Sequence, residues 1–245
     1  MAPAKKIANV KPAISAKLEV DIDLKSLKAF LDKAKLICLR NPALPVLTMF
    51  RLKVTTTGIT AFITDLESGL VQSLQGKFTT EGVVCLPVLE LLKIIQGLPK
   101  TEKRISIVDK GKGWVDITTS SGVVFTLPIF DADEYPVELA SDKTIEYAAL
   151  PCKEFLEGVG AVKGEMFPDE SMRALNGMCF TSEDGKLVLV STSGHTLALA
   201  RLPYTANKVL ADRKVVIPYK IARCLDRLLD ARMGLTIRGD GAMIF

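Results

Sequence analysis

The feature that most constrains this chain is a pattern of strands and helices that occurs twice. A strand-like run at 18–24 and a helical run at 24–40 lead, through four short β-type runs, to a second helical run at 88–98 and three more strands. The same order of strand, helix, strands and helix begins again near 145 and continues toward the last residues. A repeat of whole elements indicates two copies of one fold.

Individual residues support the repeat. Matched residues lie 125, 128 and 131 positions apart in three successive parts of the chain: Val20 and Phe30-Leu31 with Ile145 and Phe155-Leu156, Leu47 and Thr64 with Leu175 and Thr192, and Leu86-Pro87 with Ile217-Pro218. The fold class is therefore α+β, as two tandem domains that each pack two helices on antiparallel sheet. The last helix is expected over 219–231.

The domain boundaries follow from composition. Residues 1–17 are rich in Ala, Lys and Pro without periodicity, which is typical of a flexible basic tail. A polar, acidic stretch at 131–143 interrupts the pattern and is expected to be the linker. These features predict one domain at 18–140 and a second, possibly incomplete, at 144–245.

Several protein classes are excluded by what the sequence lacks. No apolar run reaches the length of about 18 to 20 residues that a membrane helix needs, and the amino terminus does not resemble a secretory signal. The cysteines are odd in number and widely spaced, which favours reduced core thiols over disulfides or a zinc site: Cys38, Cys85, Cys152, Cys179 and Cys224. We expect a soluble cytoplasmic protein with no metal, no cofactor and no membrane partner.

Charge is distributed unevenly over the predicted elements. Residues 1–17 hold four lysines and no acid, so residues 18–245 carry 28 basic and 28 acidic side chains. The four predicted helices sum to +6 and the rest of 18–245 to −6. Ordinary solvated helix faces can give such a pattern, but a basic helical surface separated from acidic sheets favours a polyanionic partner.

Short motifs in both halves resemble the bacterial DNA polymerase III beta subunit family, the sliding clamps. In the second half, the segment from Arg173 through Leu175-Asn176-Gly177 to Thr192-Ser193-Gly194-His195 resembles that family's central-domain pattern. In the first half, the similar patterns are Leu44-Pro45-Val46-Leu47, Thr64-Asp65-Leu66-Glu67, Leu127-Pro128 and Asp133-Glu134-Tyr135-Pro136. The matches follow the family's order over about 18–245.

The resemblance implies a DNA-replication processivity factor without a catalytic site of its own. Such clamp domains form a closed ring of head-to-tail protomers around duplex DNA, with helices lining the hole, and tether the polymerase without reading sequence. Lysines and arginines facing phosphates would provide that sequence-independent attraction. The implied DNA-facing residues are Lys25, Lys28, Lys35, Arg40, Arg173, Lys220, Arg223 and Arg227.

The resemblance also implies a cleft that captures short linear motifs of DNA polymerase, the clamp loader and repair proteins. An extended peptide with apolar anchors suits such a cleft, because burial supplies affinity while a few polar groups fix direction. The matching residues are Leu175, Thr192, Gly194, His195, Thr196 and Leu197. Thr196 stands where the family often has arginine.

The family has three such domains per chain, whereas this sequence has two. A three-domain protein of which this is a part would close its ring as a dimer, and a natural two-domain form would close it as a trimer. The second domain shows fewer closing strands than the first, which favours the former. A bacterial, phage or plasmid origin fits either form.

Two alternatives remain at the level of sequence. A protein with the clamp fold could bind peptide motifs without encircling DNA, as a regulatory or structural protein. An enzyme is the other alternative, and Ser191, Ser193 and His195 lie close together in sequence. However, the chain has no G-x-S-x-G elbow, and Gly111-Lys112-Gly113 lacks the spacing of a phosphate-binding loop.

Overall fold

The structure, a computed structural model, describes most of the chain in two compact units. The described residues are 18–40, 42–111, 113–136, 147–172, 175–205, 214–229, 234–238 and 243–244. Unit 1 is Met1–Glu138 and unit 2 is Leu139–Phe245. The predicted tail at 1–17 lies outside the described residues. No helix in the described part of the chain combines the length and apolarity needed to cross a membrane.

Unit 1 begins with a strand that runs directly into a helix, as predicted. β1 is Glu19–Asp23 and α1 is Leu24–Ile37. The Asp23 side chain caps α1 by accepting a hydrogen bond from the Ser26 amide at 2.9 Å. The helix ends three residues before Arg40 because the backbone of Cys38, with φ −49° and ψ 128°, is no longer helical.

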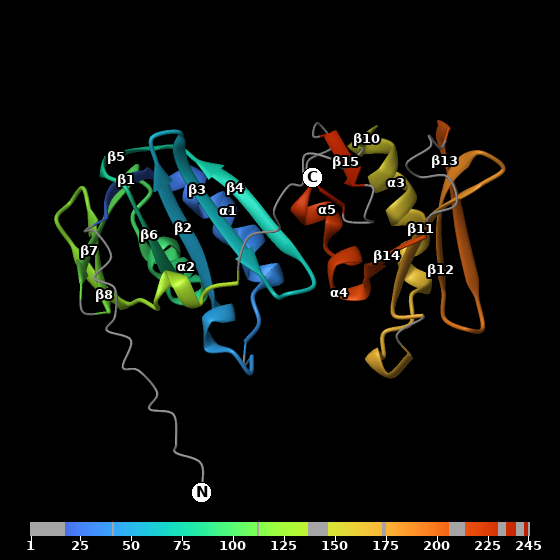
Figure 1. The fold of residues 1–245 in the computed structure, drawn as a ribbon, viewed down its shortest axis with the longest axis horizontal. Coiled ribbons are helices and arrows are strands. Elements are labelled where there is room, and N and C mark those ends of the chain that lie inside the picture. Colours follow the sequence, from blue (N-terminus) through green and yellow to red (C-terminus); the bar gives the residue numbers. More distant parts are fainter. Residues whose placement is uncertain are drawn as a thin grey trace, which may run out of the picture. The chain divides into compact units, whose positions relative to one another are not determined.

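Two antiparallel sheets form the rest of unit 1 (Figure 1). The first has the order β4-β3-β2-β6 and the second β5-β1-β7-β8-β9. Their strands are β2 Met49–Thr55, β3 Gly58–Thr64, β4 Gly69–Leu74, β5 Gly76–Thr80, β6 Gly82–Pro87, β7 Arg104–Gly111, β8 Trp114–Thr119 and β9 Val124–Pro128.

One predicted strand of unit 1 is in fact two. The run 70–78 is divided at Gln75, so that β4 belongs to the first sheet and β5 to the second. At the division, a Cβ on Gly76 would lie 2.5 Å from the Asp21 carbonyl oxygen of β1. Only glycine lets the chain pass this close as it changes sheets.

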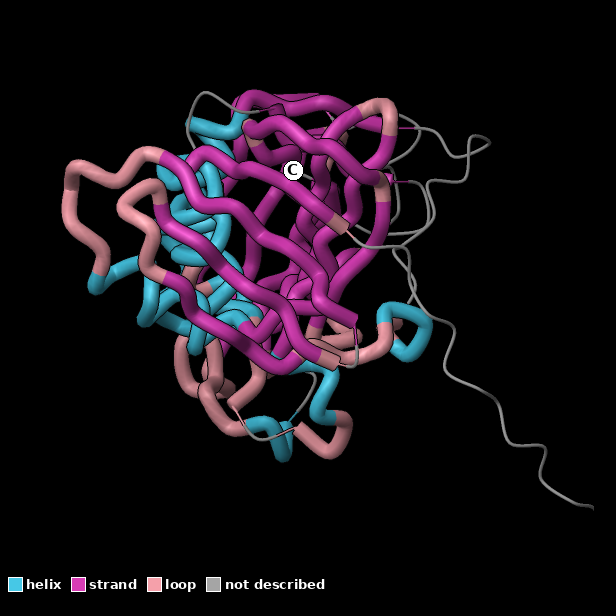
Figure 2. The backbone as a smooth tube through the Cα atoms, turned by 90° about the vertical axis from the view of Figure 1, so that its left-hand side faces the viewer, coloured by secondary structure: helices cyan, strands magenta, loops and turns pink. Residues whose placement is uncertain are grey.

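The helices of unit 1 lie on one side of its strands (Figure 2). The second helix, α2, is Val88–Gly97 and packs against α1. The buried residues of α1 form one stripe, and within it the ring of Phe30 lies 5.1 Å from that of Phe50 on β2. A core between helices and sheet therefore leaves the polar faces of the helices exposed.

Unit 2 follows the same order of strand, helix, strands, helix and strands, but the one strand β13 stands where unit 1 has β4 and β5, and its second sheet has three described strands where unit 1 has five. Its sheets have the orders β13-β12-β11-β14 and β10-β15-β16. The strands are β10 Tyr147–Pro151, β11 Gly177–Glu183, β12 Lys186–Thr192, β13 Leu197–Thr205, β14 Val215–Pro218, β15 Gly234–Arg238 and β16 Met243–Ile244, and the first helix is α3, Cys152–Val162.

The single helix predicted at 219–231 is wrong. The chain forms two short helices instead, α4 Tyr219–Ala222 and α5 Leu225–Leu228. Between them Cys224 leaves helical geometry, with φ −120° and ψ 9°. Its thiol donates to the Lys220 carbonyl oxygen at 3.1 Å, so a side chain takes part in bonding within the turn.

The repeat is confirmed, with one correction to its register. β1 and β10, α1 and α3, β2 and β11, and β3 and β12 all begin 128 residues apart, and α2 and α4 begin 131 apart. The offset of 125 predicted for the first strand and helix is wrong, because these elements also keep the offset of 128. Phe155 therefore occupies the place of Leu27, and Gly158 that of Phe30.

The predicted linker starts too early. Asp131–Pro136 belongs to unit 1, where Ala132–Glu134 forms a 3-10 turn, η2, and the Tyr135 side chain is buried. Residues 137–143 of the predicted linker lie outside the described residues. The acidic composition that suggested a linker instead belongs to a segment lying against the first sheet.

Candidate functional site

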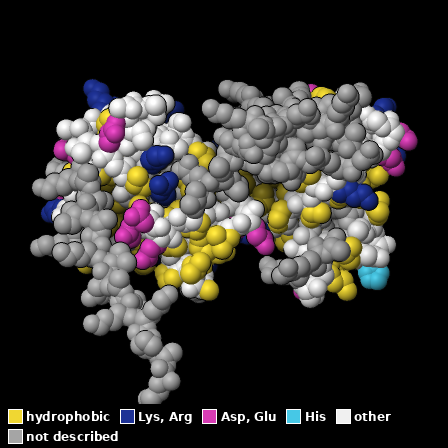
Figure 3. Space-filling model, in the orientation of Figure 1, with side chains coloured by type: hydrophobic (Ala, Val, Ile, Leu, Met, Phe, Trp, Pro, Cys, Tyr) yellow, Lys and Arg dark blue, Asp and Glu magenta, His cyan; other side chains and the backbone are white. Residues whose placement is uncertain are grey.

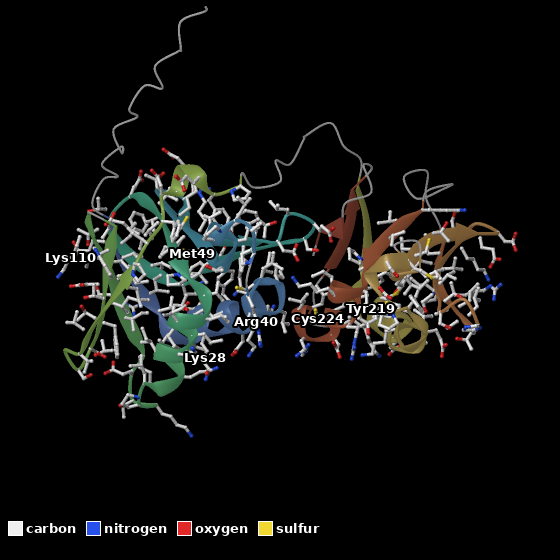
Figure 4. All side chains as sticks on the ribbon, turned by 90° about the horizontal axis from the view of Figure 1, so that it is seen from below. Lys28, Arg40, Met49, Lys110, Tyr219 and Cys224 are labelled. Atoms are coloured by element: carbon white, nitrogen blue, oxygen red, sulfur yellow. The ribbon has the colours of Figure 1, made fainter. Side chains whose placement is uncertain are left out.

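Basic side chains are exposed on the first helix of unit 1. Lys25, Lys28 and Lys35 lie on the face of α1 opposite its buried stripe, and Arg40 is exposed after the helix. Lys35 pairs with Asp32 on the same face, at 2.9 Å between Nζ and Oδ1. Figure 4 labels Lys28 and Arg40 on the helical side of unit 1. The structure thus brings these four predicted residues to the helical side of unit 1.

Unit 2 has a similar set on its two short helices. Lys220, Arg223 and Arg227 are exposed there, while Ile221, Leu225 and Leu228 are buried. Arg223 donates a hydrogen bond to the Tyr219 hydroxyl at 2.9 Å, and its guanidinium carbon lies 5.4 Å from the Tyr219 ring centroid. Arg173 lies outside the described residues.

Lys93 and Lys163 are among the basic residues of the helical elements that the sequence analysis did not single out. Lys93 is exposed on α2. Lys163 follows α3 and lines a shallow pocket of about 360 Å³ with Gly164, Met166, Tyr219 and Arg223. Its Nζ lies 3.4 Å from the Asp226 carboxylate. The sequence analysis summed the charge of each predicted helix. In that sum neighbouring acidic residues offset the positive charges of Lys93 and Lys163, so neither lysine stood out.

The predicted peptide-binding residues meet at the turn between β12 and β13. The Thr192 hydroxyl donates to the Thr196 carbonyl oxygen at 2.6 Å and accepts from the Gly194 amide at 3.1 Å. Gly194 has φ +89°, and a Cβ there would lie 3.6 Å from Leu175 Cδ1. The turn therefore needs glycine for its backbone and places Leu175 beside it.

His195 and Leu197 project from this turn. Both side chains are exposed, Leu197 at 64%. Figure 3 shows the chain's single histidine (cyan) at the surface of unit 2, next to hydrophobic side chains (yellow). The Thr196 hydroxyl donates to the carboxylate of Glu165, a residue that the motif comparison did not indicate.

An apolar row continues from the turn across the sheet. Strand pairing places Leu199 opposite Val190, Val190 opposite Cys179, and Cys179 opposite Val216. Leu199 and Val216 are exposed, and Cys179 is partly buried. Burial raises the pKa of the Cys179 thiol, and the Lys214 ammonium offsets part of that rise. We call this row, together with Leu197, the open face of unit 2.

The residues of the enzyme alternative do not converge. Ser191 is buried and its hydroxyl donates to the Val162 carbonyl oxygen on the core side of β12. Ser193 shares a hydrogen bond of 2.8 Å with the Thr196 hydroxyl, and His195 is exposed in the turn. Among the described residues, no group of three or more His, Cys, Asp or Glu side chains is placed to hold a metal ion.

Comparison with known proteins gives consistent matches over both units. Residues 18–139 match the family model of the DNA polymerase III beta subunit, N-terminal domain, and residues 149–239 match that of the central domain. The chain is 29% identical over 198 residues to the beta sliding clamp of Halalkalibacterium halodurans, covering 76% of this chain and 50% of that protein. It is 27% identical over 191 residues to the beta sliding clamp of Escherichia coli, covering 78% and 50%.

Solved structures show the same fold. A DNA polymerase sliding clamp from Caulobacter crescentus superposes with a TM-score of 0.80 at 22% identity, covering 90% of this chain and 60% of that one. A sliding clamp from Pseudomonas aeruginosa bound to griselimycin gives 0.78 at 23% identity, covering 91% and 59%. The chain spans about half the length of the curated relatives it matches.

Proposed function

The chain belongs to the DNA polymerase III beta subunit family, and from this premise we propose that it acts in a sliding clamp, which encircles duplex DNA and holds the replicative polymerase on it. In this proposal 18–140 and 144–245 are two clamp domains, preceded by a basic tail at 1–17. The matched domain models and the division into two units support these boundaries. The protein would work in the bacterial cytoplasm, at the nucleoid, and have no catalytic site of its own.

The observation that carries the DNA-binding part is the exposed cationic face of α1. Lys25, Lys28 and Lys35 occupy one side of this helix while the opposite side is buried, so a phosphate backbone can approach all three. Cations that meet phosphates displace condensed counterions and attract any duplex sequence equally. In unit 2 the corresponding candidates are Lys220, Arg223 and Arg227, with Arg40 and Arg173 as further candidates.

A clamp also needs to bind its clients and itself. We assign linear motifs of polymerase, clamp loader and repair proteins to one site in unit 2. It consists of the open face and the residues at the β12–β13 turn: Leu175, Thr192, Gly194, His195, Thr196 and Leu197. For ring closure, β9 is a terminal strand of its sheet in the described part of the chain, and Val124 on it and Val123 just before it are exposed. An apolar edge strand suits pairing with another protomer, in a dimer of three-domain chains or a trimer of two-domain chains.

Charge substitution on α1 tests the DNA-binding face. Replacing Lys25, Lys28 and Lys35 by Ser should lower the slope of log K against log salt by about 0.9 per lost phosphate contact, or about 2.7 in total. The measurement is binding to a linear duplex by fluorescence anisotropy over a series of salt concentrations. A slope equal to that of the unchanged protein would contradict the assignment.

The matched control removes the same charge from strands. Lys53, Lys77 and Lys186 lie on β2, β5 and β12, and the triple Ser variant changes the net charge by the same amount. Its salt slope should stay close to that of the unchanged protein. An equal fall in both triple variants would mean that total charge, and not the helix face, governs binding.

A further inference from the structure

The shallow pocket of unit 2 lies where the segment after α3 meets α4. Its lining residues are here called the Tyr219 pocket: Lys163, Gly164, Met166, Tyr219 and Arg223. Lys163 and Gly164 belong to a 3-10 turn, η3 Lys163–Glu165, that directly follows α3. The volume of about 360 Å³ is within the range of small-molecule sites. The pocket therefore has room for one small ligand.

The internal repeat shows that the fold does not require this pocket. With the offsets of 128 and 131 residues, the unit 1 residues at the corresponding positions are Lys35, Leu36, Cys38, Val88 and Leu92. Val88 is 0% and Leu92 5% exposed, so unit 1 fills this place with apolar side chains. Unit 2 has a glycine, a tyrosine and an arginine where unit 1 has Leu36, Val88 and Leu92. Polar side chains around an open space are a poor choice for packing, which indicates a role in binding.

Two cations line the Tyr219 pocket. The Arg223 guanidinium donates a hydrogen bond to the Tyr219 hydroxyl at 2.9 Å and lies over its ring. Asp226 offsets the charge of Lys163, at 3.4 Å from its Nζ. Among the described residues, no carboxylate forms an ion pair with Arg223. The pocket therefore keeps a positive charge, and a guanidinium held in place is a favourable partner for a phosphate.

The rest of the lining suits a flat ring. Tyr219 is partly buried, and Met166 is only 4% exposed. Aromatic rings, guanidinium planes and thioethers all make favourable contacts with planar rings such as nucleobases. The bases of a duplex are paired and stacked, so a duplex would offer this face only its phosphates. An unpaired nucleotide offers both a phosphate and a base, and so matches the whole lining.

We propose that the Tyr219 pocket binds one unpaired nucleotide, with its phosphate at Arg223 and Lys163 and its base against Tyr219 and Met166. The proposal deepens the DNA-binding function proposed above and rests on it, because Arg223 is one of the residues assigned there to DNA. The nucleotide has two sources, a single-stranded stretch of DNA or a free nucleotide, and the test separates them.

Gly164→Leu tests the pocket without changing any charge. A Cβ added at Gly164 would have no neighbour within 4 Å, and unit 1 has leucine at the corresponding position, so the variant should fold with its side chain in the pocket. Binding is measured by fluorescence anisotropy, with labelled oligothymidylate and separately with a labelled duplex. Loss of one stacked base should weaken binding of oligothymidylate about tenfold. Binding of the duplex should stay unchanged.

Gly160→Leu is the matched control. It adds the same side chain one helical turn earlier, at an exposed position of α3 where a Cβ also has no neighbour within 4 Å. Both measurements should stay unchanged in this variant. Tyr219→Leu removes the ring and should weaken oligothymidylate binding about tenfold, whereas Tyr219→Phe keeps the ring and should bind more tightly than Tyr219→Leu.

Thymidine 5′-monophosphate, titrated by calorimetry, provides the second arm. Weaker binding of oligothymidylate by Gly164→Leu assigns the pocket to a strand, and loss of monophosphate binding alone assigns it to a free nucleotide. If Gly164→Leu changes neither, the pocket does not bind a nucleotide. If it weakens the duplex as much as the single strand, the pocket receives only backbone phosphates, and the proposal is overturned.

Failure of the DNA-binding function would give a different result. An unchanged protein that does not bind duplex DNA at low salt would contradict the DNA-facing role of the helices, whatever Gly164→Leu does to the single strand. A protein that binds the duplex, but binds both nucleotide probes independently of Gly164, would contradict the pocket alone.

Discussion

At the scale of single residues, Glu102 shows how one carboxylate organises a turn of unit 1. Its oxygens accept hydrogen bonds from the amides of Ser120 and Ser121, each at 3.1 Å, and from the Ser120 hydroxyl. These hydrogen bonds hold the pKa of the Glu102 carboxyl below its ordinary value of 4.5. The ionised carboxylate therefore stabilises the turn that leads into β9.

Glu102→Gln should lower the melting temperature of the protein at neutral pH. A pKa lowered by folding contributes stability that is present above pH 4.5 and is lost as the pH falls through the folded-state value. The gap between the two melting temperatures should therefore shrink in acid. Scanning calorimetry across pH measures this, with Glu90→Gln on the exposed face of α2 as control. A gap that stays constant with pH would contradict the assignment.

Matching of individual residues located the repeat but gave the wrong offset for its first helix, 125 residues where the structure has 128. Phe30 was paired with Phe155, although the structure places Gly158 at the position of Phe30. Each unit has a pair of phenylalanines in contact in its core, Phe30 with Phe50 and Phe155 with Phe180, but the two pairs occupy different positions of the repeat. Core volume can be filled from either place, so identical residues need not occupy identical positions. A single sequence does not reveal such an exchange.

At the scale of elements, the position of β9 at the end of its sheet could not be predicted from the sequence. The strand was predicted, but its place at the end of the order β5-β1-β7-β8-β9 comes only from the topology. Its Val124 side chain is 52% exposed, and Trp114 on the paired strand β8 is also exposed. An uncovered apolar edge is unfavourable unless another strand or protomer covers it.

Val124→Asp should therefore weaken self-association of the protein. A buried, unpaired carboxylate at a strand-pairing interface carries a desolvation cost that pairing cannot offset, so the equilibrium should shift toward monomer. Sedimentation velocity over a concentration series measures the shift. Val71→Asp, on the edge strand of the other sheet, is the matched control. Equal assembly of the Val124→Asp variant and the unchanged protein would exclude β9 from the interface.

Most elements were predictable because their boundaries carry local signals, such as the Asp23 cap and the Pro87 that precedes α2. The failures have non-local causes. Gln75 divides two strands because Gly76 passes against β1. The segment Asp131–Pro136 resembled a linker because its acidic composition hides the contact of Tyr135 with Met49 and Thr64. Contacts between distant segments decide these cases, and composition does not report them.

At the scale of the whole molecule, the net charge of +4 conceals an organised distribution. The body from residue 18 onward is neutral, yet its predicted helices sum to +6 and its remaining segments to −6. The structure adds that the α1 lysines share one exposed face, and that Lys220 on α4, Arg223 just after it and Arg227 on α5 are exposed. Attraction without base contacts would permit a clamp to move along DNA.

The candidate site was predictable in part for the same reasons. The β12–β13 turn was identified because its residues are contiguous, so a motif could report them. The open face of unit 2 was not, because Leu199, Cys179 and Val216 come from three strands and meet only through pairing.

In the proposed function the assembled protein surrounds DNA, and this topological link between ring and DNA can be measured. The protein is loaded onto a nicked circular plasmid by a bacterial clamp loader, washed in high salt, and quantified on the DNA before and after the plasmid is linearised. A ring should remain on the circle in high salt and leave when an end is created, because it is held by linkage and not by charge. Release by salt from the circle, or retention after linearisation, would show that the protein does not encircle DNA.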